Sequence, residues 1–215
     1  FFASTSFLTL KQITTNVDTF VTSKTKPLFG ADIVVSSRSY ATGDLFPMIA
    51  PVLSGLDFMV AERREFSTTL FDKENKTGLV QVVAYSGSYP QKGILNTEPL
   101  PSDKYREQKV SATPGLIEKF SQYGVISLDK RDIFITDTIL ESSDLGYSLG
   151  TENHLLILPM ELLSGSMLLS SGSRLNQDLL ISFGDERNVN KITEKLKKLL
   201  PESLYRVRSY EERTE

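Results

Sequence analysis

The pattern of hydrophobic positions predicts a helix and a strand near the start of the chain. Apolar side chains recur at helical spacing over residues 10–28, with hydroxyl and acidic residues on the other face, so this stretch predicts a long amphipathic helix. Gly30 then gives a turn. Residues 30–38 follow as a β-branched apolar run closed by polar residues, which is typical of a buried strand.

The last forty residues carry a second clear pattern. Residues 178–183 predict a strand, and residues 189–200 predict an amphipathic helix with apolar positions on one face and lysines mostly on the other. Asn188 is placed to cap this helix, and Pro201 stops it. Residues 205–210 alternate with period two, as in a strand. These elements predict a β-α-β unit.

The middle of the chain is richer in strands and turns. After a short helix near residues 45–53, the segments 58–71 and 79–85 predict an antiparallel hairpin. The further elements expected are a short helix begun by Thr113 and Pro114, strands at 125–128, 132–139 and 155–158, and a helix that begins at Met160.

Together these elements predict an α+β fold with two lobes. Residues 1–57 and 170–215 are expected to form an α/β lobe from both chain ends, with an N-terminal stalk helix. Residues 58–169 are expected to form an inserted β-rich lobe. We therefore expect contacts between Ile33–Val35 and Leu179–Phe183.

Composition excludes several kinds of site. The 215 residues include no cysteine and one histidine, so thiolate nucleophiles, disulfides and sites that need several histidines are excluded. The net charge is −3, which argues against a nucleic-acid partner because such partners usually need a basic face. Charged residues make up 24% of the chain and hydrophobic ones 40%, as in an ordinary globular protein.

The remaining polar residues show no catalytic pattern. His154 precedes an apolar strand and is interpreted as a structural residue. The basic pairs Lys104/Arg106 and Arg206/Arg208 are interpreted as solvated strand faces. Five acidic residues in one region form no metal-binding loop and are interpreted as a solvated rim; they are Asp129, Asp132, Asp137, Glu141 and Asp144. The sequence thus predicts no catalytic residue, no cofactor-binding residue and no metal ligand.

Two apolar stretches suggest contacts beyond the chain. Residues 164–172 are apolar but rich in serine and glycine, so Met167 and Leu168 are candidates for contact with a partner. The alternative is a buried helix followed by a surface loop. Residues 1–10 are apolar and uncharged. They fit either the start of a trimmed soluble domain or the last turns of a membrane helix.

Two motifs carry a resemblance to a known family. Residues 28–38, with Gly30-Ala31-Asp32 before the strand, resemble the segment that follows the first membrane helix in bacterial ABC-transporter permeases of the MacB, LolC and FtsX kind, especially the YbbP-like permeases. Residues 79–85 followed by Tyr89-Pro90-Gln91-Lys92-Gly93 resemble the family's strand and Tyr-Pro-x-x-Gly turn. The polar stretch 127–131 departs from the family pattern.

The resemblance implies a periplasmic domain between two membrane helices of the bacterial inner membrane. It implies a separate cytoplasmic ABC ATPase, a second permease subunit, and mechanical work on a lipoprotein, a lipid, a peptide or a periplasmic partner protein. Both chain ends should then leave the domain on one side. Tyr89 and Pro90 join Met167 and Leu168 as candidate partner contacts. A free-standing periplasmic binding or adaptor protein is the alternative, and an enzyme of unrecognised class is a third hypothesis.

Overall fold

The fold was analysed in a computed structural model. It describes residues 30–37, 45–71, 77–101, 108–121, 124–145, 147–148, 153–169, 175–184 and 188–210. The helix predicted over residues 10–28 and the basic residues Lys104 and Arg106 lie outside these ranges.

β-Strands make up the largest share of the described residues, and helices accompany them, as expected for an α+β fold. The helices are α2 (Phe46–Leu53), α3 (Pro114–Phe120) and α4 (Val189–Leu199), with 3-10 turns η1 (Met160–Leu163) and η2 (Met167–Leu169). The longer strands are β1 (Ile33–Ser37), β2 (Phe58–Phe71), β3 (Thr77–Gly87), β4 (Leu95–Pro99), β8 (Asp137–Ser142), β10 (Leu155–Pro159), β11 (Asn176–Phe183) and β12 (Tyr205–Ser209). The shorter ones are β5 (Ser111–Ala112), β6 (Val125–Leu128), β7 (Arg131–Phe134) and β9 (Tyr147–Ser148).

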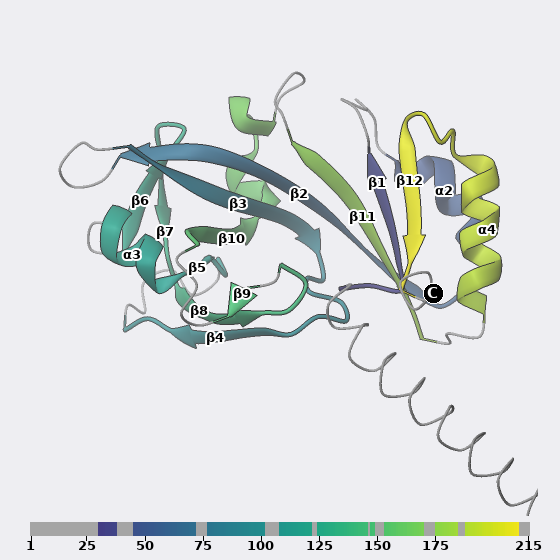
Figure 1. Cartoon of the computed structure of the whole chain (residues 1–215), viewed down its shortest axis with the longest axis horizontal. Coiled ribbons are helices and arrows are strands. Elements are labelled where there is room, and N and C mark those ends of the chain that lie inside the picture. The colour runs from purple at the N-terminus through teal and green to yellow at the C-terminus, as the bar shows by residue number, and fades with distance from the viewer. Residues whose placement is uncertain are drawn as a thin grey trace, which may run out of the picture.

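One large sheet runs through the molecule. Within the described residues its strands pair in the order β12-β1-β11-β2-β3-β10-β5-β8-β4, with β9 added to β8. The sheet curls at the β4 end, so that β4 and β8 lie below β2 and β3 in Figure 1. Strands β6 and β7 form a separate hairpin. The predicted hairpin of residues 58–71 and 79–85 is confirmed, because β2 and β3 pair antiparallel along their length.

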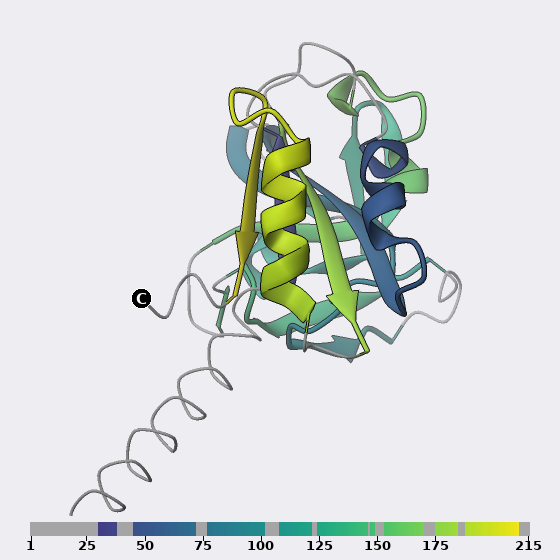
Figure 2. The same cartoon turned by 90° about the vertical axis from the view of Figure 1, so that its right-hand side faces the viewer.

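The two chain ends share one part of this sheet. β1 pairs antiparallel with β11 and with β12, so β11, α4 and β12 form a β-α-β unit with β1 inserted between its strands. Ile33 lies opposite Ile181, which confirms the expected contact between the first strand and residues 179–183. Helices α2 and α4 lie side by side over one face of these strands (Figure 2).

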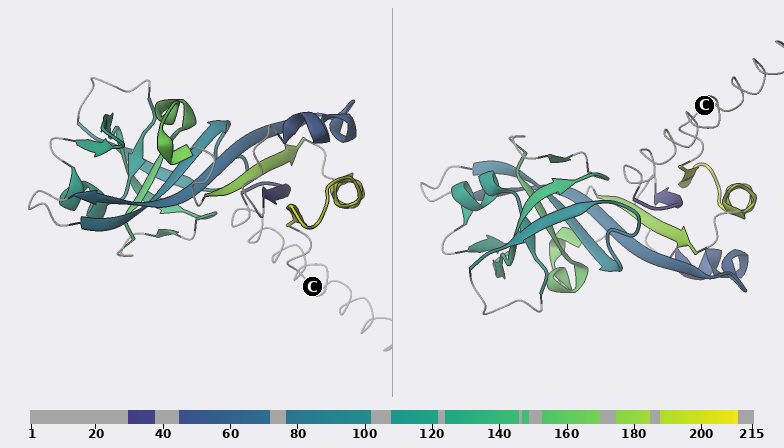
Figure 3. Two further views of the ribbon diagram at one scale, coloured as in Figure 1. Left: turned by 90° about the horizontal axis from the view of Figure 1, so that it is seen from above. Right: turned by 90° about the horizontal axis from the view of Figure 1, so that it is seen from below.

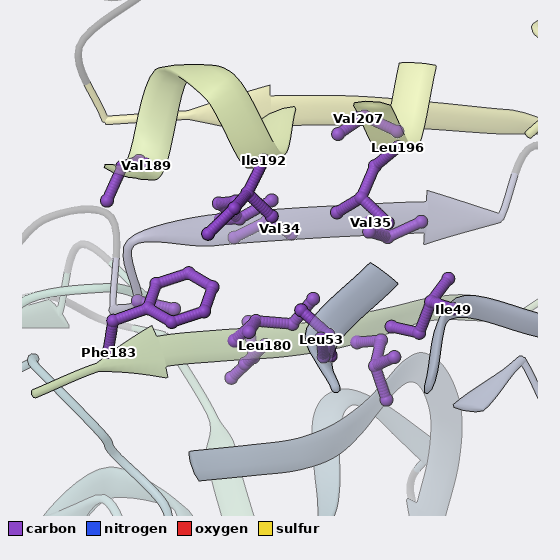
Figure 4. Packing of buried hydrophobic residues seen from close by; sticks show 14 of the residues in the cluster. Val34, Val35, Ile49, Leu53, Leu180, Phe183, Val189, Ile192, Leu196 and Val207 are labelled. Carbon is purple, nitrogen blue, oxygen red and sulfur yellow. The ribbon is translucent and has the colours of Figure 1, made fainter. Parts of the chain in front are cut away.

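Apolar packing between the two helices and these strands forms what we call the end core. Its buried members lie within residues 31–61 and 179–210. Val189, Ile192 and Leu196 point from α4 toward β1 (Figure 4), while Ile49 and Leu53 contribute from α2. The helical spacing of these apolar positions explains why the tail forms an amphipathic helix that docks on the sheet.

The inserted core, by contrast, is made mainly by strands. Its two buried clusters draw their members from residues 66–163, on both faces of β3 and β10. All four residues from Leu155 to Leu158 are buried, as expected for a central strand with a parallel neighbour, here β3. Seen from above, the two cores lie at opposite ends of an elongated molecule (Figure 3). The expected lobe boundaries at 57/58 and 169/170 stay a prediction.

Local expectations in the inserted region need two corrections. The strand expected at 132–139 is two strands, β7 and β8, which belong to different sheets. The chain crosses between the sheets at Ile135 and Thr136, where Val110 N donates to Thr136 Oγ1 at 3.0 Å and Thr136 N donates to Val110 O at 2.9 Å. The helix expected from Met160 is only the short 3-10 turn η1. Thr113 and Asn188 occupy the N-cap positions of α3 and α4, but neither side chain makes the capping hydrogen bond.

The described chain enters β1 and leaves β12 at the same end of the sheet. Ile33 is opposite Ser209, and Tyr210 N donates to Asp32 O at 3.3 Å. This agrees with the expectation that the chain enters and leaves on one side. The direction of the expected stalk helix lies outside the described residues.

Candidate functional site

The most distinctive polar site lies between the two cores, on the sheet face opposite α2 and α4. Strand alternation places Ser36, Asp178 and Arg63 side by side on this face, since each is the register partner of the next. Ala61 belongs to the end core and Phe66 to the inserted core. Arg63 therefore stands on β2 where the strand passes from one core to the other.

Arg63 contacts three carboxylates at this position. Its Nη1 donates to Asp144 Oδ2 at 3.0 Å, its Nη2 donates to Asp178 Oδ2 at 2.7 Å, and its Nε lies 3.0 Å from Glu65 Oε1. The side chains of Arg63 and Asp178 are each 10% exposed, and that of Asp144 is 1% exposed. Together with Tyr89, these residues form what we call the junction cluster.

Asp144 is the most deeply buried acid of the cluster. Besides Arg63, it accepts hydrogen bonds from Tyr89 Oη at 2.6 Å and from Ser142 Oγ at 3.1 Å. The interpretation of Asp144 as part of a solvated rim is therefore wrong. Its side chain was misjudged because the loop that carries it folds back over the sheet, which the local sequence does not reveal. The hydroxyl of Tyr89, a candidate partner contact, thus donates its hydrogen bond to the Asp144 carboxylate.

Burial and charge perturb the acid–base behaviour of the cluster. Burial opposes the charged guanidinium, yet Glu65 and Asp178 together raise the pKa of Arg63 above its ordinary value. Burial also raises the pKa of Glu65; Arg63 opposes this rise, while Asp178 and Asp144 add to it. Burial and the neighbouring Asp144 raise the pKa of Tyr89 well above its ordinary value. Arg63 and Tyr89 therefore stay protonated at neutral pH, and Glu65 takes up a proton more readily than an ordinary glutamate.

A second polar contact lies nearby, which we call the lysine clamp. Lys92 Nζ lies 2.7 Å from Asp32 Oδ2, and Asp32 is fully buried. The same carboxylate accepts the backbone N–H of Phe183 at 2.8 Å. Lys92 N also donates to Gly30 O at 3.0 Å. The clamp thus fastens the loop after β3 to the point where the chain enters β1.

The clamp brings together the two motifs that carry the family resemblance. Gly30-Ala31-Asp32 and Tyr89-Pro90-Gln91-Lys92-Gly93 lie far apart in sequence, but Lys92 bonds Asp32 and Tyr89 bonds Asp144. Gly30 has φ +77°, and a Cβ there would lie 3.1 Å from Asp144 Cβ. Glycine at this position therefore serves both the turn and the close approach of the Asp144 loop. The sequence located both motifs but not their contact.

A polar cavity of about 440 Å³ opens beside the junction cluster. It is lined by Ser36, Ser37, Arg63, Glu65, Gln81, Asp144, Leu145, Asn176, Asp178, Arg206 and Arg208. Arg206 is exposed, in line with its interpretation as part of a solvated strand face. Arg208 is half-buried and donates from Nη2 to Ser36 Oγ at 3.3 Å. The cavity gives water access to the otherwise buried carboxylates.

The candidate partner contacts lie in two different places. Met167 is 77% exposed, whereas Leu168 is half-buried against the inserted core. Their turn is held by Asp129, whose Oδ2 accepts Ser166 Oγ at 2.6 Å and Met167 N at 3.1 Å. Tyr89 and Pro90 are half-buried next to the junction. The structure therefore does not bring the four candidates together into one surface.

The described ranges contain neither a cluster of metal-ligand side chains nor a helix suited to a membrane. No group of three or more histidine or acidic side chains there is arranged to hold a metal ion. None of the helices in the part of the chain that the structure describes is long and apolar enough to cross a membrane. His154 packs edge-on against Phe120, with ring centroids 5.2 Å apart.

Comparison with known proteins connects this geometry to a fold. No protein-family model matches the chain, and no curated protein matches it. Among solved structures, the periplasmic region of MacB from Actinobacillus actinomycetemcomitans superposes with a TM-score of 0.53 at 16% identity, over 86% of this chain and 92% of that one. The extracellular domain of the noncanonic ABC-type transporter YknZ from Gram-positive bacteria gives 0.51 at 11% identity, over 82% and 100%.

These likenesses define the class of fold. The chain has the mixed α/β fold of MacB-type extracytoplasmic domains, and the likeness spans almost the whole of both solved domains. The fold expected from the resemblance of the two motifs is therefore confirmed.

Proposed function

We propose that this chain is the extracytoplasmic domain of a bacterial ABC-transporter permease. In this role it couples ATP hydrolysis by a cytoplasmic subunit to movement of a lipoprotein, lipid, peptide or partner protein outside the inner membrane. The observation that carries the proposal is the chain path. The chain enters and leaves the fold side by side at one end of the sheet, through β1 and β12. A domain carried between two membrane helices needs this arrangement.

The lysine clamp supports the mechanical part of the proposal. A movement of Gly30 would be transmitted directly to Lys92. The two contacts that transmit it are the hydrogen bond from Lys92 N to Gly30 O and the ion pair between Lys92 and Asp32. Lys92 belongs to the loop after β3, whose strand lies in the inserted core. Motion of the chain ends would thus be passed to the inserted core through a buried contact rather than through a flexible linker.

We further propose that the two cores act as two lobes, joined by β2 and by the junction cluster. Met167 and Leu168, on the turn held by Asp129, are then the candidate contacts for a partner outside the membrane. Tyr89 and Pro90 would act nearer the junction. The second permease subunit and the cytoplasmic ATPase would be reached through membrane helices.

The proposal is tested by the location of the domain in cells. The chain, expressed in its native reading frame, carries Met167→Cys, and intact cells are treated with a membrane-impermeant maleimide. The chain has no cysteine of its own, so it contributes no background. We expect labelling before lysis, with the labelled protein retained in the membrane fraction after an alkaline wash. Leu163→Cys is the matched control, because Leu163 is fully buried and should stay unlabelled.

The other outcomes separate the alternatives. Labelled protein that is released into the soluble periplasmic fraction would support a free-standing binding or adaptor protein instead. Protein that is labelled only after lysis would contradict both hypotheses. A screen of hydrolase substrates with the purified chain addresses the third hypothesis, an enzyme.

A further inference from the structure

The junction cluster contains more negative than positive charge. Glu65, Asp144 and Asp178 are arranged around the single guanidinium of Arg63. Like charges held this close in a partly buried site repel one another, and one cation cannot neutralise all three. A proton is the simplest species that removes the excess.

The other charged and titratable groups that face Glu65 do not remove this excess. Tyr89, from the loop after β3, stays neutral because its pKa is raised. Lys92 is paired with Asp32. Arg206 and Arg208 line the same cavity, and Arg208 bonds Ser36, the register partner of Asp178. The cation that acts on the pKa of Glu65, however, is Arg63.

We propose that the junction cluster is a proton-operated latch between the two cores. Asp178 belongs to β11 of the end core, and Asp144 to the loop whose neighbour Leu145 packs on the inserted core. With Glu65 protonated, Arg63 binds Asp144 and Asp178 alone and joins the two regions. With Glu65 ionised, its carboxylate attracts Arg63 Nε and repels both aspartates, and the junction loosens.

The direction of the response follows from the environment of Glu65. Burial, Asp178 and Asp144 raise its pKa against the opposing effect of Arg63. An acid whose pKa is raised by folding destabilises the folded state when it is ionised. Protonation removes this destabilisation, so the junction becomes tighter as the pH falls through the raised pKa. The change is therefore centred above the ordinary glutamate value of 4.5. The open cavity lets protons reach the site.

The inference rests on the proposed role of the junction in passing motion between the cores, but its test needs only the 215-residue chain. Because the chain has no cysteine, Leu79→Cys and Leu199→Cys accept two spin labels cleanly. Leu79 is 66% exposed on the β2–β3 hairpin and Leu199 is 46% exposed on α4, so the pair spans both cores. Double electron–electron resonance spectroscopy then gives the distribution of distances between the two labels from pH 4 to pH 8.

We expect a broad distribution at high pH that narrows on acidification, with a midpoint above pH 4.5. Glu65→Gln should give the narrow distribution at every pH. Glu62→Gln is the matched control, since Glu62 lies on the same strand but pairs with Arg64 at 2.7 Å outside the cluster, and it should respond like the unsubstituted protein. A distribution independent of pH, or a response unchanged by Glu65→Gln, would overturn the latch. Either result would leave the topology test of the proposed function unaffected.

Discussion

The end core and the inserted core reach burial by different means. The end core packs two helices, α2 and α4, against one face of four strands, and its members come from the two extremes of the chain. The inserted core is built mainly from strands that are apolar on both faces, with one short helix, α3, as a cover. Between them lies a polar junction where ionic contacts replace apolar packing.

This difference separates two kinds of contact, the apolar packing inside each core and the ionic contacts of the junction between them. Close apolar packing makes each core resist deformation. Ionic contacts depend on protonation and salt, so the junction is the place where the relation between the cores can change without unfolding either one. Substitutions in the end core, the inserted core and the junction should therefore change the free energy of unfolding by different amounts. They should also differ in how far through the molecule their effects extend.

The largest effect is expected from Arg63→Met. Removing the cation takes the guanidinium away from three carboxylates in a largely buried site, at a cost of about 3–5 kcal/mol in the free energy of unfolding. Urea denaturation measures this cost, which should shrink as the pH falls through the raised pKa of Glu65. Arg63→Lys keeps the charge but cannot reach three directions, so it should fall in between. A loss below about 1 kcal/mol would mean that the junction contributes little to holding the cores together.

Leu196→Ala should destabilise the end core by about 2–5 kcal/mol, because it empties a fully buried position between α4 and the sheet. Leu199→Ala, on the exposed side of the same helix, should change the free energy of unfolding by less than about 0.5 kcal/mol. Hydrogen exchange should increase in β1, β11 and α4 but not in β10. Equal exchange in β10 would show that the two cores unfold as one unit.

Gly78→Ala tests the inserted core alone. A Cβ on Gly78 would overlap the ring of Phe120 on α3, so the hairpin and α3 must shift apart. The expected cost is about 1–3 kcal/mol. A double-mutant cycle with Phe120→Leu should recover much of it, since the smaller side chain leaves room. Additive effects of the two substitutions would mean that the cost of Gly78→Ala does not come from overlap with the Phe120 ring.

The smallest effect is expected on the surface of α4. Lys197 Nζ lies 3.3 Å from Glu194 Oε1 at i,i+3 spacing, and Glu194 is mostly exposed. Glu194→Gln should lower the free energy of unfolding by no more than about 0.5 kcal/mol. Thermal denaturation in 1 M salt should abolish the difference, because salt screens exposed charges. A larger loss would mean that α4 needs this pair to dock.

Periodicity in the sequence was sufficient to predict individual elements of the end core, such as β1 and α4. Apolar spacing in residues 189–200 and the β-branched run after Gly30 depend on local rules, and both elements are present. The junction cluster was missed because its contacts join residues as far apart as Arg63 and Asp178, 115 positions in sequence. One signal was available. Residues 62–65 are Glu-Arg-Arg-Glu between the apolar residues 58–61 and Phe66, which makes both strand faces polar at that point and marks the gap between the cores.

Two local predictions in the inserted region were wrong for different reasons. Residues 132–139 alternate well enough for one strand, but the hydrogen bonds of Thr136 to Val110 divide them between two sheets. The four-residue turn at Met160 has helical composition and lacks the length for an α-helix. A distant contact thus decided the first outcome, and the short length of the segment decided the second.

The position of β1 between β11 and β12 has a consequence for the order of folding. Asp32 accepts a hydrogen bond from a residue 151 positions later, and Ser36 contacts a residue 172 positions later. Contacts of such long sequence separation form slowly, because a large loop must close before they can stabilise the chain. During synthesis, β1 remains unpaired until β11 and β12 have emerged, whereas the β2–β3 hairpin can form much earlier. The inserted core is thus expected to serve as the template on which the two chain ends finally close.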